Sequence, residues 1–275
     1  MTSFFDDLAN SEQKLLEQLS SSPLVEIIGL VNIKGVGASR RGKEKLWTMT
    51  FKFDVWRIGN GKMEKDLFVR RQVTDRELKK FQRKIKAESI IKIRGRVLSE
   101  NTLDSAHALF EKYIKSNIHD SEIENHLTEI RKPVVYQDDL LGTFNYNRRM
   151  GWFENVILWG NEKINLRLDI EKMGDLDAAI EVIHILYKDQ AIWNKKIVDY
   201  AVSELLPLKN ESWIVEDEEE ITQEQFKKQI ELLSITVHQD GSYEFWYDDG
   251  DLFLGHALVV SGNITDGPDD VDLVG

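Results

Sequence analysis

The sequence predicts an α+β protein of two domains, an interpretation that rests on three observations. A chain of 275 residues is long enough for two hydrophobic cores. Hydrophobic residues make up 41% of it and charged residues 31%, as in ordinary globular proteins. Segments that alternate apolar and polar residues are interleaved with segments of helical spacing, which indicates strands and helices in both halves.

The sign of the charge changes near Pro133, which places the predicted domain boundary there. Residues 1–132 contain 25 Lys and Arg against 19 Asp and Glu, whereas residues 133–275 contain 11 against 29. Within residues 34–96 the basic residues outnumber the acidic ones by 20 to 7, an excess that attracts polyanions. We therefore predict a basic domain over residues 1–132 and an acidic domain over residues 133–275, in a chain of net charge -12.

The absence of cysteine excludes several classes of site. Without thiols the chain forms no disulfide, offers no cysteine nucleophile and holds no cysteine-ligated zinc. Residues 1–10 lack the basic start and apolar run of a secretion signal, and no apolar stretch reaches the length of a membrane span. We therefore expect a cytoplasmic protein with no membrane association and no cofactor.

The first half is predicted to open with a helix and to continue mainly as strands. Residues 10–19 place leucines on one helical face, and a capping box of Thr74 with Glu77 begins a second helix. Strands are predicted where Val, Ile and aromatic residues alternate with polar ones, over residues 24–34, 46–57, 63–71 and 89–98, with a hairpin turn at residues 59–61.

Three strands, a helix and a fourth strand are the order of an OB-type barrel without its fifth strand. Residues 106–113 supply that strand if they are not helical, and the sequence leaves both possibilities open. Residues 119–132 are charged and compatible with a helix that leads to the boundary. The first half therefore resembles an OB-type barrel in topology alone.

The second half is predicted to be an α+β domain with an antiparallel sheet and two or three helices. Apolar residues at helical spacing run over residues 176–206, as one helix or two, after an N-cap at Asp175 and up to Pro207. A second capping box begins at Thr222, just after an acidic run at residues 216–220. Strands are predicted over residues 141–146, 152–159, 162–168, 235–239, 242–248 and 252–264, with a frayed tail after Gly267.

Three segments of the second half carry a family likeness. They are residues 141–144 (Leu-Gly-Thr-Phe), residues 152–154 (Trp-Phe-Glu) and above all residues 240–251 (Asp-Gly-Ser-Tyr-Glu-Phe-Trp-Tyr-Asp-Asp-Gly-Asp), which run on to Gly255 and His256. Over about residues 138–275 the chain resembles a bacterial family catalogued as domain of unknown function 2262. The resemblance implies no activity. Related small bacterial domains occur among immunity proteins of toxin systems, which suggests a protein-binding role by analogy.

Residues 37–43 match the first seven positions of a phosphate-binding P-loop. The eighth position should be Ser or Thr, to bind magnesium, and is Glu44. The motif must also open a helix, whereas residues 46–57 alternate like a strand. We therefore interpret this segment as a basic hairpin loop and reject nucleotide hydrolysis.

Cations and aromatic rings alternate with the predicted core residues of the barrel strands. Rings stack on bases and cations neutralise phosphates, so a sheet face that carries both can bind single-stranded nucleic acid or RNA. The structural alternatives are that this sheet face is polar only for solubility, or that it is covered by the N-terminal helix or by intramolecular docking of the acidic domain. The residues predicted to face solvent and to form this surface are Lys52, Trp56, Phe68, Arg70, Lys92, Arg94 and Arg96.

The hairpin around residues 242–248 is predicted to bury one aromatic face. Alternation places Tyr243, Phe245 and Tyr247 together, and the opposite face is rich in carboxylates. We predict that this opposite face binds a protein partner. Its residues are Glu244, Trp246, Asp248, Asp249 and Asp251.

The same segment offers a weaker metal site. If the two histidines near its ends meet across the sheet, they and the neighbouring carboxylates could hold a metal or act as acid and base. The spacing differs from that of a calcium loop, and no zinc-protease or nucleophile-elbow motif occurs. The candidate ligands are His238, Asp240, Asp248, Asp251 and His256.

These observations favour a non-catalytic bacterial binding protein over an enzyme, and no catalytic residue is assigned. In the leading hypothesis the acidic domain engages a protein partner, in an immunity-like or regulatory role. The alternatives are single-stranded nucleic-acid or RNA binding by the basic domain and a metal-dependent hydrolase at the C-terminal hairpin.

Overall fold

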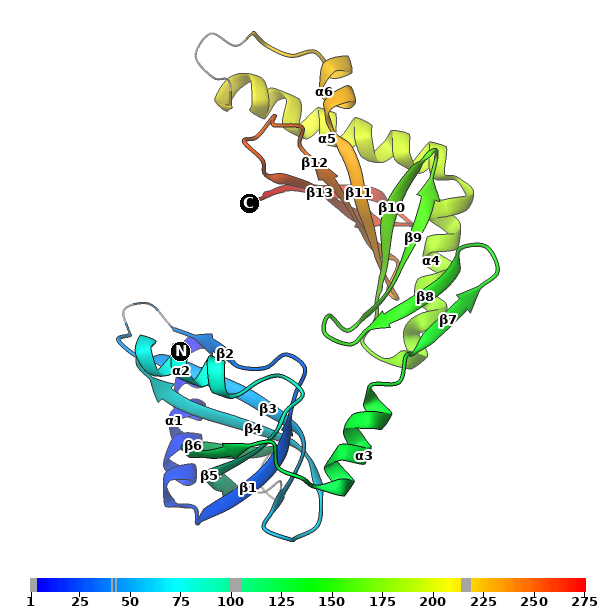
Figure 1. Ribbon diagram of the computed structural model, residues 1–275. Coiled ribbons are helices and arrows are strands. Elements are labelled where there is room, and N and C mark those ends of the chain that lie inside the picture. The colour runs from blue at the N-terminus through cyan, green and yellow to red at the C-terminus, as the bar shows by residue number, and fades with distance from the viewer. Residues whose placement is uncertain (1–3, 41, 43, 99–104, 214–218) are drawn as a thin grey trace. The chain divides into compact units, whose positions relative to one another are not determined.

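A computed structural model describes residues 4–40, 42, 44–98, 105–213 and 219–275 (Figure 1). The chain divides into two compact units, Met1–Lys132 and Pro133–Gly275. Each unit has its own sheet and its own hydrophobic core. The predicted α+β fold class is confirmed, and the units are described one at a time.

The N-terminal unit is a closed five-stranded barrel of OB type, as predicted. Its hydrogen-bonded order is β1-β5-β6-β4-β3, and β3 closes the barrel by pairing with β1. Strands β4 and β6 are parallel, as the fifth strand of this topology requires, so residues 106–113 are a strand. The strands are β1 (Leu24–Val31), β3 (Trp47–Ile58), β4 (Glu64–Val73), β5 (Ile90–Leu98) and β6 (Ala106–Ser116), with the short β2 (Gly37–Ser39) added at the edge of β3.

Three helices pack on this barrel. Helix α1 (Phe4–Ser21) lies against β5 and β6, and α3 (Ser121–Ile130) lies against β1 and β3. Helix α2 (Asp75–Lys84) begins at the predicted capping box: Thr74 Oγ1 accepts from Glu77 N, and Thr74 N donates to Glu77 Oε2 at 2.9 Å. The hydrogen bonds that Thr74 N and Thr74 Oγ1 donate to the Glu77 carboxylate hold the pKa of this carboxyl below its ordinary value.

A β-bulge in β3 overturns the predicted orientation of Trp56. Phe53 and Val55 pair with consecutive residues of β1, so Asp54 is an extra residue in β3. Beyond it the alternation inverts. Val55 packs outside the barrel, under α3, and Trp56 turns into the barrel core, where it is 2% exposed. The prediction that Trp56 faces solvent was therefore wrong.

The C-terminal unit is an eight-stranded sheet in which each strand pairs with its neighbour in the chain. Strands β10 and β11 are parallel, because helices intervene between them and return the chain to the same end of the sheet; the other neighbours are antiparallel. The strands are β7 (Val135–Asp138), β8 (Gly142–Asn147), β9 (Trp152–Trp159), β10 (Glu162–Asp169), β11 (Glu231–His238), β12 (Ser242–Asp248), β13 (Ala257–Asn263) and β14 (Gly267–Val274).

The helices of this unit cover one face of the sheet (Figure 1). Apolar residues of α4 and α5 form a single core with the inner residues of the strands, including Phe153, Ile235 and Phe245. The helices are α4 (Leu176–Lys188), after a 3-10 turn η2 (Met173–Asp175), α5 (Gln190–Ser212) and α6 (Gln223–Gln229), which begins at the predicted Thr222 capping box.

Two predicted boundaries were wrong. Helix α5 continues through Pro207 to Ser212, because Leu205 and Lys209 on either side of the proline are buried against the core and hold the next turn in place. The tail after Gly267 is not frayed. It forms β14, whose Val271 and Leu273 pack on the core. Asp175 precedes α4, but its carboxylate accepts from Lys172 N rather than from an amide of that helix.

Candidate functional site

A groove of ≈ 440 Å³ lies on the β3–β4 side of the barrel, beside the loop that carries β2. In the OB topology this face, between the second and third barrel strands, is the one that binds oligonucleotides and oligosaccharides. The groove combines cations, an aromatic ring and small polar groups. It is lined by Asn32, Lys34, Gly35, Gly37, Thr50, Phe51, Lys52, Phe68, Val69 and Arg70.

Phe68 supplies the exposed ring of this groove. It is 40% exposed, although a phenylalanine on a strand is usually buried. Its ring stacks on that of His107, with centroids 5.6 Å apart and planes at 27°. Lys52 Nζ lies 5.5 Å from the ring centroid and 2.6 Å from Asp66 Oδ1. A planar ring with a cation beside it is what base stacking next to a phosphate requires.

Arg70 and His107 lie behind this ring. The Arg70 guanidinium reaches Glu12 of α1 at 3.6 Å, and its Nε is buried without a hydrogen-bond partner among the described residues. Burial lowers the pKa of the His107 imidazole, and the nearby charge of Arg70 lowers it further. His107 is therefore mainly neutral at pH 7, and Arg70 is the cation behind the Phe68 ring.

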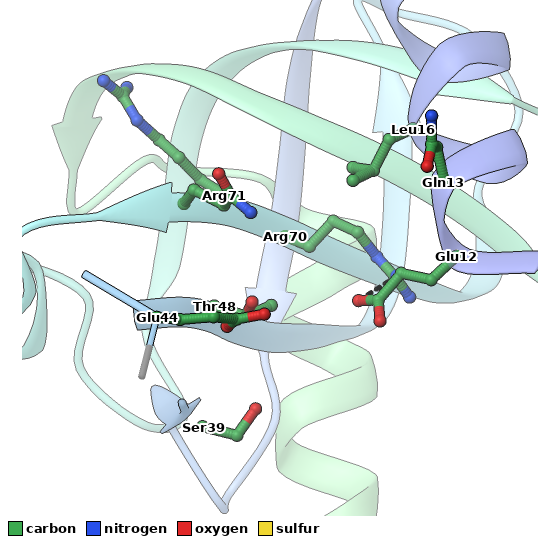
Figure 2. A pocket seen from close by; sticks show the side chains of 9 residues that line it. Glu12, Gln13, Leu16, Ser39, Glu44, Thr48, Arg70 and Arg71 are labelled. Carbon is green, nitrogen blue, oxygen red and sulfur yellow. Dashed lines mark ion pairs between the residues drawn. The ribbon is translucent and has the colours of Figure 1, made fainter. Parts of the chain in front are cut away.

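Arg70 also lines a second pocket, of ≈ 320 Å³, between α1 and the β2 edge (Figure 2). Figure 2 shows its side chain pointing toward Glu12, while Arg71 points away from both. Glu12 and Glu44 make this pocket partly acidic. The basic groove therefore ends at Arg70.

The structure divides the predicted nucleic-acid surface into separate parts. Lys52, Phe68 and Arg70 share the β3–β4 groove. Lys92, Arg94 and Arg96 lie on β5, where the first two pair with Glu26 of β1 at 2.7 and 2.9 Å. Arg96 bonds to Glu111 Oε1 and to Ser22 O. Strand β6 and helix α1 lie between the two sets, so they do not form one platform.

Sequence reasoning missed the groove residues Lys34 and Thr50, and it missed His107, whose ring stacks on Phe68. His107 lies between Ala106 and Ala108, which face the core, so it would have been placed outward had residues 106–113 been read as a strand. Thr50 alternates outward between Met49 and Phe51, so the parity that placed Lys52 on this face also applied to it. Lys34 had no comparable signal, because it lies in a turn.

The C-terminal sheet has a second face, on which no helix of the described residues packs. One row of paired residues crosses it from β7 to β14. Two tryptophans lie on this face, and each donates its indole N–H to the glutamate two residues away, Trp152 to Glu154 at 2.8 Å and Trp246 to Glu244 at 2.9 Å. The row consists of Val135, Asn145, Glu154, Arg167, Thr236, Glu244, Ser261 and Asp270.

Part of this face is hollow and part of it is apolar. Arg167 lies over the Trp152 ring at 5.1 Å and lines a pocket of ≈ 440 Å³ together with Asn145 and Glu154. Next to it, Val156 and Leu158 on β9 are 58% and 53% exposed. Exposed aliphatic residues beside polar ones are typical of a protein contact surface.

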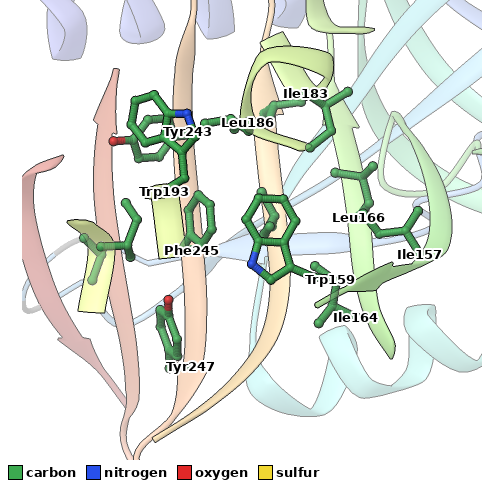
Figure 3. Packing of buried hydrophobic residues seen from close by; sticks show 14 of the residues in the cluster. Ile157, Trp159, Ile164, Leu166, Ile183, Leu186, Trp193, Tyr243, Phe245 and Tyr247 are labelled. Atoms are coloured by element: carbon green, nitrogen blue, oxygen red, sulfur yellow. The ribbon is translucent and has the colours of Figure 1, made fainter. Parts of the chain in front are cut away.

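The hairpin carboxylates do not form one surface. Tyr243, Phe245 and Tyr247 are buried on the helix side, as predicted (Figure 3), and Glu244 and Trp246 lie on the open face. Asp249 is only 2% exposed. It accepts from three backbone amides of the following turn, so the prediction that it lies on the solvent-facing carboxylate surface was wrong. Asp248 and Asp251 are exposed at the strand end. Part of the acidic run at residues 216–220 lies outside the described residues.

The predicted metal cluster does not come together. His238 and Asp240 lie at one end of β12, whereas Asp248 pairs with the first residue of β11 at the other end. The strand between them is about 20 Å long. His256 bonds to Phe253 O at 2.6 Å. Within the described part of the chain no three His, Asp or Glu side chains are placed to hold a metal ion.

A buried carboxylate–imidazole pair went unnoticed in the sequence. Asp138, at the end of β7, is 7% exposed and accepts from Leu140 N, Leu141 N and His184 Nε2 of α4, the last at 3.0 Å. Burial raises the pKa of Asp138, but these hydrogen bonds outweigh it, so the net pKa lies below the ordinary value. The pair ties β7 to α4, and 46 residues separate its members, so no local motif reveals it.

Two family models match the chain. One, described as an uncharacterized protein conserved in bacteria (DUF2262), matches residues 138–273, and the other, a domain of unknown function (DUF7021), matches residues 12–130. No curated protein and no solved structure matches the chain. No helix in the described residues is long and apolar enough to cross a membrane.

Proposed function

Residues 138–273 belong to the bacterial family DUF2262, whose description assigns no activity, and we propose that the protein acts by binding, with single-stranded nucleic acid held in the β3–β4 groove of its N-terminal barrel. The observation that carries the proposal is Phe68, a 40% exposed ring with Lys52 and Arg70 in the same groove. A base would stack on the ring while the cations meet the flanking phosphates.

The contacts that hold Lys52 in place are weak enough to be exchanged. Its side chain is 33% exposed and its partner Asp66 is 51% exposed. Exposed ion pairs contribute about 0–1 kcal/mol, and exposed cation–π contacts a similar amount. An incoming base can therefore displace the Lys52 ammonium from the ring, and a phosphate replaces Asp66 as its partner.

Substitution of Phe68 is expected to weaken binding of a fluorescein-labelled oligo-dT or oligo-U to the full chain. Loss of one stacked base costs about 1–3 kcal/mol, so Phe68→Ala should raise the dissociation constant by about 5- to 150-fold. Lys52→Glu should weaken binding and reduce the salt slope by about one. Fluorescence anisotropy at several salt concentrations measures both effects.

Matched variants on the rest of the barrel provide the controls. Leu24→Ala removes a 48% exposed apolar side chain from β1, and Arg94→Ala removes a cation from β5. Both should bind within about twofold of the unsubstituted chain, because neither lines the groove. Absence of binding at low salt, or equal losses for Phe68→Ala and Leu24→Ala, would contradict the proposal.

A second candidate function is contact between the open face of the C-terminal sheet and a protein with a basic surface. The observation that favours it is the pairing of Trp152 and Trp246 with glutamates on the face that also carries the exposed Val156 and Leu158. Tryptophans surrounded by polar groups are frequent anchors of protein interfaces. The excess of 29 acidic over 11 basic residues in this half would favour a basic partner.

Capture experiments with two variants test this second function. Trp246→Ala with Leu158→Ser should abolish capture of the partner by the full chain, because both residues lie on the open face, whereas Phe68→Ala should leave it unchanged. Capture should also weaken between low and high salt. Recovery of nucleic acid alone, or of proteins that both variants retain equally, argues against a partner on this face.

A further inference from the structure

The groove and the smaller pocket of ≈ 320 Å³ lie along the same face of the barrel, and Arg70 lines both of them. Three cross-strand pairs follow one another there, and their side chains alternate with core residues of β3 and β4. The pairs are Lys52 with Phe68, Thr50 with Arg70, and Thr48 with Gln72. The first two pairs line the groove and the last lines the pocket, so the pocket continues the groove toward α1.

The spacing of these pairs fits a single strand of nucleic acid that runs along β3 and β4. Consecutive pairs on one face of a sheet lie about 7 Å apart, so Thr48 and Gln72 lie about 13 Å from Phe68 along the strands. An extended nucleic-acid strand covers that distance within a few nucleotides, and one OB-type fold binds about 4–16 of them. A strand with one base stacked on Phe68 therefore brings another base to the pocket.

The pocket differs from the groove in its chemistry. None of its described lining residues is aromatic, and two of them, Glu12 and Glu44, carry carboxylates. A carboxylate repels a phosphate, and it accepts hydrogen bonds without donating any. The amides and hydroxyls of the pocket both donate and accept, and Arg71 points away from Glu12 (Figure 2). The carboxylates therefore set the preference of the pocket, which is for an uncharged group that donates.

Glu12 is the better placed of the two carboxylates. It lies on a helix, and Arg70 holds it from the groove side, with Arg70 Nη1 3.6 Å from Glu12 Oε1. The Glu12 side chain is 34% exposed, so a ligand in the pocket can reach it. A separation of 3.6 Å is too long for a hydrogen bond, and a carboxylate has about four acceptor positions. Glu12 can therefore keep Arg70 as its partner and accept two hydrogen bonds from a ligand.

Guanine is the base whose edge matches a carboxylate. Its Watson–Crick edge presents N1–H and the N2 amino group side by side, which gives one donor for each carboxylate oxygen. Adenine and cytosine present one amino group beside a ring nitrogen that accepts, and thymine and uracil present one N–H between two carbonyls. In these four bases an acceptor would face a carboxylate oxygen, which is unfavourable.

We propose that the pocket between α1 and the β2 edge is a guanine subsite of the nucleic-acid groove, in which Glu12 accepts from N1–H and the N2 amino group of the base. This subsite rests on the proposed function of the groove and gives it a sequence preference, for a guanine within a few nucleotides of the base on Phe68. Arg70, which borders both sites, meets a phosphate between the two bases. Thr48 and Gln72 line the pocket from the strands.

Fluorescence anisotropy with the full chain measures this preference. The probes are a short fluorescein-labelled oligo-dT and the same strand with one internal guanine, hypoxanthine, adenine or cytosine. The guanine strand should bind about 5- to 150-fold more tightly than oligo-dT, which is the discrimination of one bidentate base contact. Hypoxanthine keeps O6 and N7 of guanine but lacks the N2 amino group, so its strand should lose most of this gain. The adenine and cytosine strands should bind within about threefold of oligo-dT, because the one hydrogen bond they gain is offset by the facing acceptor.

Two variants locate the guanine contact. Glu12→Gln keeps the shape of the side chain but replaces one acceptor oxygen by a donor, so the guanine and oligo-dT strands should bind it within about twofold of each other. Glu64→Gln removes the same charge from an exposed position of β4 outside both pockets, and should leave the guanine preference unchanged. The ratio of the two affinities is the readout, because a change in net charge or in folding alters both affinities alike.

The possible results separate the subsite from the groove. Equal binding of all strands, together with the expected loss for Phe68→Ala, would overturn the guanine subsite and leave the groove intact. A guanine preference that hypoxanthine shares, or one that survives Glu12→Gln, would also overturn it, because the base would then be read at O6 and N7 by another residue. Absence of binding by every strand at low salt would overturn the proposed function of the groove, and the subsite with it.

Discussion

Asp249→Ala is expected to destabilise the C-terminal unit by about 3–5 kcal/mol. The carboxylate is 2% exposed and accepts from Asp251 N at 3.1 Å, Phe253 N at 2.7 Å and Gly255 N at 3.1 Å. Each buried amide left without a partner costs about 1–3 kcal/mol, and the loop would relax to hydrate some of them. Denaturant-dependent hydrogen exchange of residues 231–275 in the full chain measures the loss for this unit separately.

The neighbouring carboxylates are the matched controls. Asp248 and Asp251 are exposed, so their alanine variants should change stability by no more than about 0.5–1 kcal/mol. Asp249→Asn keeps one acceptor oxygen and should fall between these values and the alanine variant. If Asp249→Ala were as stable as Asp248→Ala, the loop would not depend on this carboxylate, and a surface role for Asp249 would be open again.

Asp249 also shows why this region was harder to predict than its neighbours. Alternation of Tyr243, Phe245 and Tyr247 identified the buried face, since side-chain period in a strand is a local property. After Asp248 the strand ends and the period no longer applies. Whether a carboxylate in a turn faces water or caps amides depends on the path of the next residues, and Asp251 and Leu254 both adopt positive φ there.

The strand order of the barrel was predictable for a similar reason, and the error in the prediction of its side-chain orientations is also local. Turn residues, a capping box and alternating strands specified the OB-type order, because each signal lies within a few residues. One extra residue, Asp54, inverted the parity of β3 and moved Trp56 from the expected binding face into the core. The alternation of residues within one strand cannot reveal a bulge, because a bulge is defined by how that strand pairs with its partner.

Site predictions failed where they required two distant segments to meet. His238 and His256 were placed together by the assumption that they lie across the sheet, but register sets them near opposite ends of β12. Asp138 and His184 do meet, and nothing local marks them. The pocket between α1 and the β2 edge likewise needs Glu12 beside Thr48 and Gln72, which only the packed fold supplies.

Arg57→Ala is expected to cost the N-terminal unit about 3–4 kcal/mol at neutral pH. The guanidinium forms a bidentate contact with Asp120, through Nε at 2.9 Å and through Nη2. Its Nη1 donates to Glu122 Oε2 at 2.7 Å. Asp120 is also the N-cap of α3 and accepts from Ile123 N. Its side chain is 7% exposed, and a buried carboxylate that loses its cation is destabilised by about 3–5 kcal/mol. Hydrogen exchange of residues 24–58 and 121–130 measures the loss.

The pH dependence of this loss tests its electrostatic origin. Burial raises the pKa of Asp120, but the hydrogen bonds from Arg57 and Ile123 N outweigh it, so the net pKa lies below its ordinary value of 3.8. A carboxyl with a lowered folded-state pKa contributes stability that is complete above its unfolded pKa and is lost as pH falls through the folded one. The difference between Arg57→Ala and the unsubstituted chain should therefore be constant from pH 7 to about pH 5 and shrink below about pH 4.

Arg131→Ala is the control for this prediction. Arg131 pairs with Glu88 at 3.0 Å, but its side chain is 53% exposed, so the pair should contribute no more than about 1 kcal/mol. The stability lost in Arg131→Ala should also diminish in high salt, whereas the buried contact of Arg57 is shielded from the solvent ions. A loss for Arg57→Ala that is small, or that salt removes, would show that α3 is held by the apolar contacts of Ile123 with Leu30 and Val55 rather than by the ion pair.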